Sequence, residues 1–61
     1  MTRMKKEVLD HEIRYTYKVE NKNRMSYLVF NRYKCFKDST GAFGGWDMEH
    51  KCYYVTVRYA R

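Results

Sequence analysis

Apolar and polar residues alternate without interruption in residues 12–19. Every second side chain in this run is apolar, starting with Ile13 and ending with Val19, and the side chains between them are charged or carry a hydroxyl group. A period of two over eight residues is typical of a β-strand that buries one side. Because Leu9 and His11 extend the apolar positions toward the N-terminus, we predict a strand over about residues 9–19.

The end of the chain has the same alternation. From Cys52 to Tyr59, one set of alternate positions holds aromatic and β-branched residues, and the other set contains Thr56 and Arg58. Residues of these types are common in strands. We therefore predict a further strand over about residues 51–60.

The pattern of residues 25–36 is less regular. Apolar side chains occur at both sets of alternate positions, as they should in a central strand, and β-branched and aromatic residues are frequent. A helix is the rival interpretation, because Leu28, Arg32 and Phe36 recur every four residues. We favour a strand, which the polar residues 20–24 would join to the preceding one as a hairpin.

Together these runs predict one small domain over residues 1–61 that is mainly β, or small α+β. Its centre would be a three-stranded antiparallel meander of about residues 9–19, 25–36 and 51–60, with a long loop at 37–50. Residues 2–10 could add a short helix, with Thr2 as its cap. A single sheet must cover its apolar side. We expect a second copy of the chain to do this, which would give a homodimer of stacked sheets.

Charge is distributed unevenly along the chain. The formal net charge is +6, and residues 13–37 account for all of it, with seven basic residues and one acid. A hydrophobic content of 44% and an aromatic content of 18% are too high for a disordered basic tail. A localised positive charge on a folded domain attracts phosphates or an acidic protein surface.

Cations and aromatic rings recur together on the predicted outer side of the sheet. Cations hold the phosphates of single-stranded DNA or RNA, and aromatic rings stack against its bases. The predicted nucleic-acid-binding residues are Arg14, Lys18, Phe30, Arg32, Lys34, Phe36, Tyr54 and Arg58. The alternative is a second small core formed by the apolar members of this set, with the cations extending outward.

The predicted loop contains all three glycines and the only tryptophan of the chain. Phe43, Trp46 and Met48 could close the open end of the core, or they could anchor a protein partner. The second option gives the alternative function, an inhibitor or adaptor that binds a host protein such as a nucleic-acid-processing enzyme. A short, basic, tyrosine-rich composition is typical of such accessory proteins of phages and mobile elements.

Catalysis, metal binding and cofactor binding find no support in the spacing of reactive residues. The glycines at 41–45 are not followed by the lysine of a nucleotide-binding loop. Zinc sites usually have two closely spaced pairs of ligands, and here only His50 and Cys52 are close in the sequence. We expect a non-enzymatic binding protein without a cofactor.

No apolar run is long enough to span a membrane, and acids follow the basic start where a signal peptide would be apolar. We therefore expect a cytoplasmic protein.

Overall fold

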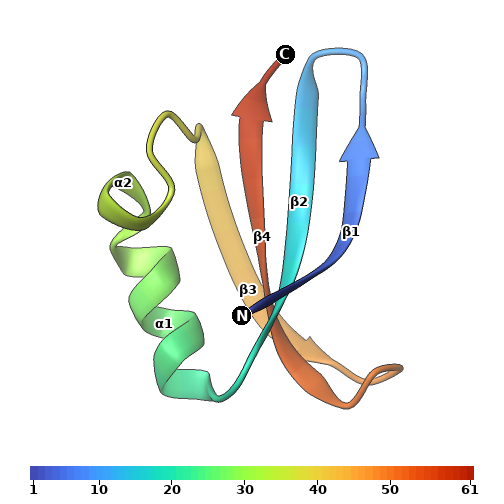
Figure 1. The fold of residues 1–61 in the computed structure, drawn as a ribbon, viewed down its shortest axis with the longest axis vertical. Helices are drawn as coiled ribbons and strands as arrows, with labels where there is room; N and C mark the ends of the chain where they lie inside the picture. Colours follow the sequence, from blue (N-terminus) through green and yellow to red (C-terminus); the bar gives the residue numbers. More distant parts are fainter.

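Four strands form one antiparallel sheet in the computed structural model, which describes residues 1–61 (Figure 1). The strands are β1 (Thr2–Val8), β2 (Glu12–Val19), β3 (Gly41–Asp47) and β4 (Cys52–Ala60), in the order β1-β2-β4-β3. Two helices, α1 (Lys22–Phe30) and α2 (Arg32–Cys35), connect β2 to β3. The predicted mainly β class and antiparallel sheet are confirmed.

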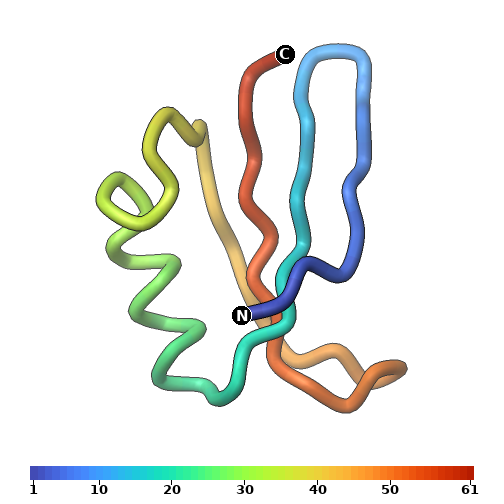
Figure 2. Tube along the Cα trace, viewed as in Figure 1, coloured from blue at the N-terminus to red at the C-terminus, as the bar shows by residue number.

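The order of the strands differs from the predicted meander. Strand β4 pairs with β2 on one side and with β3 on the other. The helices therefore lead the chain from β2 to β3 at the far edge of the sheet, and β4 then occupies the position between these two strands. The two hairpin turns lie at opposite ends of the sheet (Figure 2). The C-terminus lies beside the first turn, where the backbone N–H of Arg61 donates to the carbonyl of His11.

The predicted strand at residues 25–36 is wrong, because most of this segment is helical. The Asn21 side chain caps α1 by accepting a hydrogen bond from the backbone N–H of Arg24 at 2.8 Å. Met25, Leu28 and Val29 then lie on the side of the helix that faces the sheet. A cap and a helical spacing of apolar residues outweigh the strand preference of aromatic and β-branched side chains here.

Two other expectations also need correction. Residues 2–8 form an edge strand rather than a helix, and the strand β3 occupies part of the predicted 37–50 loop. Strand β1 is largely exposed and contains a bulge between Arg3 and Lys5, so no period of two marks it in the sequence. The glycines of β3 mask its strand character in a similar way.

The core lies between α1 and the β3–β4 half of the sheet. Leu28 of α1 is 2% exposed and packs with Val19, Val55 and Val57, and Phe36 completes this cluster. Gly44 of β3 permits the approach of the helix, because a Cβ there would lie 2.8 Å from Cγ of Met25. The helix therefore covers the apolar side for which a second copy was expected. The homodimer remains a prediction, but an uncovered apolar side is no longer a reason for it.

Tyrosines continue this layer over the β1–β2 half of the sheet. The Tyr17 ring stacks on Phe36 with centroids 5.9 Å apart, and Tyr15 meets Tyr59 edge-on at 5.7 Å. Burial beside the other tyrosines raises the pKa of the Tyr59 hydroxyl above its usual value of 10.0. Neither helix is long and apolar enough to cross a membrane.

Two substitutions in α1 test this packing. We expect Leu28→Ala to lower the free energy of unfolding by about 2–5 kcal/mol, because it leaves a cavity in the core. We expect Phe30→Ala to change it by less than about 0.5 kcal/mol, because the Phe30 side chain is 81% exposed. Urea unfolding followed by circular dichroism measures both. Equal losses would contradict the assigned orientation of α1.

Candidate binding surfaces

The sheet has two sides with different surroundings. We call the side under the helices the helical side, which includes Tyr15, Tyr17, Val55 and Val57. We call the other side the open side, because no helix covers it; β2 and β4 contribute Arg14, Thr16, Lys18, Tyr54, Thr56 and Arg58 to it.

The predicted nucleic-acid-binding residues do not form one surface. Arg14, Lys18, Tyr54 and Arg58 lie on the open side, as the alternation predicted. The other four belong to the helical layer, because residues 25–36 are not a strand. Phe30 and Lys34 are exposed there, whereas Phe36 is in the core at 7% exposure, and the Arg32 guanidinium donates to the carbonyl and hydroxyl of Ser39.

The helical layer carries an uninterrupted set of cations. No acidic residue occurs between Asn21 and Lys37. Of its five cations, Lys22, Arg24, Lys34 and Lys37 are exposed, and Arg32 is partly buried. On the same side of the sheet, β1 contributes Arg3 and Lys6, which lie 5.8 and 5.7 Å from the centroid of the Tyr15 ring.

Three exposed aromatic rings lie among these cations. Phe30 is 81% exposed, Tyr33 66% and Tyr27 50%. The guanidinium of Arg24 lies 5.6 Å from the centroid of Tyr27, and the ammonium of Lys34 lies 5.9 Å from that of Tyr33. We call this set the basic helical surface: Lys22, Arg24, Tyr27, Phe30, Tyr33, Lys34 and Lys37. The sequence prediction included Phe30 and Lys34 and missed the other five residues. A helical interpretation of residues 25–36 could have identified Tyr27, because it lies three residues before Phe30 and on the face of the helix away from Leu28.

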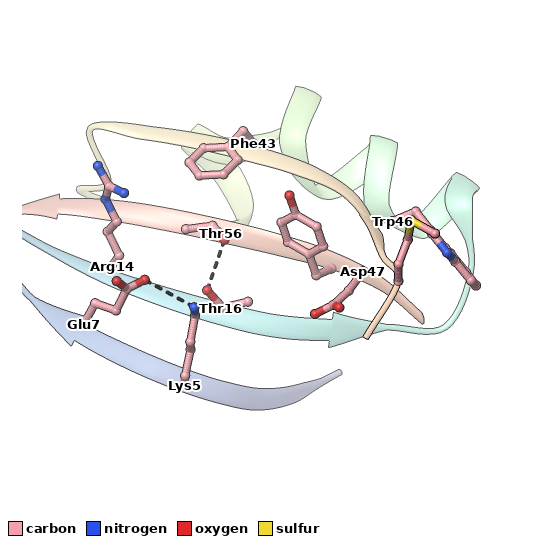
Figure 3. A pocket seen from close by; sticks show the side chains of 10 residues that line it. Lys5, Glu7, Arg14, Thr16, Phe43, Trp46, Asp47 and Thr56 are labelled. Atoms are coloured by element: carbon pink, nitrogen blue, oxygen red, sulfur yellow. Dashed lines mark hydrogen bonds and ion pairs between the residues drawn. The ribbon is translucent and has the colours of Figure 1, made fainter. Parts of the chain in front are cut away.

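The open side contains a groove with a volume of about 390 Å³. In Figure 3, Lys5 and Glu7 of β1 lie along one side of this groove and Phe43 of β3 lies on the other. Its floor includes Thr16 and Thr56, which are 6% and 5% exposed and whose hydroxyl oxygens lie 3.0 Å apart. The two hydroxyls form a hydrogen bond with each other, which gives each a partner where water has little access.

The predicted partner-anchoring residues Phe43, Trp46 and Met48 all line this groove. They are 43%, 51% and 81% exposed, so they do not close the core. Trp46 also meets the Tyr53 ring edge-on at 4.9 Å. The structure thus brings the three residues together around one groove, and that arrangement leaves the anchor role open to test.

Most charges of the open side are paired. The ammonium of Lys5 lies 3.6 Å from the carboxylate of Glu7, and Arg14 pairs with Glu12. Asp47 closes the turn after β3 by accepting hydrogen bonds from the backbone N–H groups of Glu49 and His50. Hydrogen bonds from the backbone and the ring of His50 hold the pKa of the Asp47 carboxyl below its usual value of 3.8. This side therefore presents acids and bases in similar numbers.

Comparison of the chain with protein-family models, with curated proteins and with solved structures finds no match in any of the three.

The threonine pair on the groove floor gives a test of this geometry. We expect Thr16→Val or Thr56→Val alone to cost about 1–3 kcal/mol of unfolding free energy, because each leaves one buried hydroxyl without a partner. The double substitution should cost much less than the sum, because it removes both hydroxyls. A double-mutant cycle by urea unfolding measures the difference. Additive losses would show that the hydroxyls do not interact.

Proposed function

We propose that this chain is a non-enzymatic protein that binds single-stranded nucleic acid through its basic helical surface. The observation that carries the proposal is a stretch of five cations without one acid, between Asn21 and Lys37, folded so that three aromatic rings are exposed among them. Cations that neutralise phosphates release counterions, and exposed rings stack on unpaired bases. Both kinds of contact are available on this one surface.

Phe30 is the most informative residue of this surface. Its ring lies at the end of α1 with 81% of the side chain exposed, so packing within the chain does not account for it. Stacking of one base on such a ring contributes about 1–3 kcal/mol to binding. A duplex keeps its bases stacked on each other, so the rings favour a single-stranded ligand.

The open side is a poorer surface for a polyanion. Glu7, Glu12 and Asp47 lie there among the cations, and the first two form ion pairs with Lys5 and Arg14. Phosphates approaching this side would meet carboxylates as often as free cations, and like charges at an interface oppose binding. Because of this contrast, we propose the helical layer, and not the predicted sheet surface, as the site that binds nucleic acid.

Salt dependence tests the electrostatic part of the proposal. With four exposed cations meeting phosphates, affinity for a labelled single-stranded 20-mer should fall roughly 50-fold between about 50 and 200 mM salt. Fluorescence anisotropy measures this dependence. Phe30→Ala should weaken binding about fivefold or more, because one base loses its stacking partner. Lys34→Gln should reduce the slope of log affinity against log salt concentration by about the amount that one phosphate contact contributes.

A matched substitution on the open side controls for net charge. Lys18→Gln removes one exposed cation outside the basic helical surface and should change affinity much less than Lys34→Gln. Equal effects of the two substitutions would make the binding non-specific. Binding that is undetectable at about 50 mM salt, where phosphate contacts are strong, would overturn the proposed function.

A further inference from the structure

Arg58 is a cation of the open side that has no partner within the chain. Its Nε is buried and makes no hydrogen bond. None of the four ion pairs of the chain includes it. Buried donors in native proteins are normally satisfied, so one that is not calls for an explanation.

The Arg58 side chain packs against the neighbouring strand, β3. Gly41 of β3 is the residue directly opposite Arg58, and it is buried. A Cβ at Gly41 would overlap Nη2 of Arg58 and lie 3.0 Å from its Nε. The guanidinium therefore lies against the backbone of β3, on the side of the sheet that also carries Phe43.

On its other side, Arg58 faces a like charge. Arg14 of β2 is directly opposite Arg58 in the sheet, and cross-strand pairs of like charge are unfavourable. Arg14 pairs with the carboxylate of Glu12, but no second acid serves Arg58. Of these two guanidinium groups, only that of Arg14, at the end of the groove where Phe43 also lies, has a carboxylate as its partner.

We propose that the open side is a docking site for a segment of a partner protein that carries a single acidic residue, and that Arg58 binds the carboxylate of this Asp or Glu side chain. A guanidinium binds a carboxylate through two parallel hydrogen bonds. Lifting from Gly41 toward the carboxylate would give the buried Nε the acceptor that it lacks. This inference is independent of the proposed nucleic-acid binding, which uses the other side of the sheet.

The adjoining groove indicates what lies next to that carboxylate. Phe43, Tyr54 and Met48 line it, and a volume of about 390 Å³ accommodates one large apolar side chain. Glu7 and Asp47 line it as well, so a run of acids or phosphates would be repelled there. The matching segment therefore has a single acid flanked by apolar residues.

Titration followed by NMR tests the site with a defined probe. The probe is a pentapeptide blocked at both ends, Gly-Leu-Glu-Phe-Gly, and its matched control has Gln in place of Glu. Added to about 10 mM, above the millimolar range of weak contacts, the Glu peptide should shift the Nε–Hε signal of Arg58 and the amide signals of Phe43 and Tyr54. The Gln peptide should bind at least about tenfold more weakly.

Two variants separate the guanidinium from charge in general. Arg58→Lys keeps the charge but loses the planar pair of donors, and it should bind the Glu peptide about tenfold more weakly. Lys18→Gln removes an open-side cation that does not line the groove and should leave peptide affinity unchanged. Loss of the Nε–Hε signal in Arg58→Lys also assigns that signal.

Four results would overturn the inference. The first is that the Arg58 signal does not shift at about 10 mM peptide, and the second is that the Glu and Gln peptides bind equally well. The third is that inorganic phosphate at that concentration causes the same shifts. The fourth is that a single-stranded oligonucleotide displaces the peptide. None of the first three affects the proposed nucleic-acid binding, whose assay reports on the other side of the sheet. The fourth would show that the two ligands share one surface.

Discussion

The contact of α1 with β3 at Gly44 determines how the rest of the molecule is arranged. A side chain at this position would collide with Met25 of the helix and with the carbonyl of Tyr54. Because the position is a glycine, the helix comes close enough for Leu28 to reach the valines of β2 and β4. That packing fixes the rotation of α1, and the rotation turns Tyr27 and Phe30 toward solvent.

One helical layer on a four-stranded sheet also separates the charges of the chain. The crossover between β2 and β3 carries five lysines and arginines that form no ion pair, and no acid lies among them from Asn21 to Lys37. These cations therefore lie on the helical side of the sheet. The open side keeps most of its acids and bases in pairs around a groove, and Arg58 and Lys18 are its cations outside these pairs. A small domain thereby gains two surfaces of different chemistry, one suited to a polyanion and one suited to a single carboxylate beside an apolar group.

Burial explains which parts of the fold the sequence could predict. β2 and β4 are central strands with one covered side, so burial imposes a period of two on them and their positions follow from it. β1 is an exposed edge and β3 is rich in glycine, so neither carries that period. In residues 25–36 the exposed aromatic residues imitate a strand, and only the Asn21 cap and the spacing of buried residues indicate a helix. The error moved Phe30 and Lys34 to the wrong element, whereas Tyr54 and Arg58 were placed on the correct side.

Changes in the amide NMR signals on adding a single-stranded DNA 20-mer would show which side of the sheet binds nucleic acid. We expect shifts confined to α1, α2 and the cations Arg3 and Lys6 that β1 contributes to the same side of the sheet, with Thr16 and Thr56 of the open side unaffected. Shifts centred on Arg14 and Tyr54 would contradict it, because they would place the nucleic acid on the open side of the sheet.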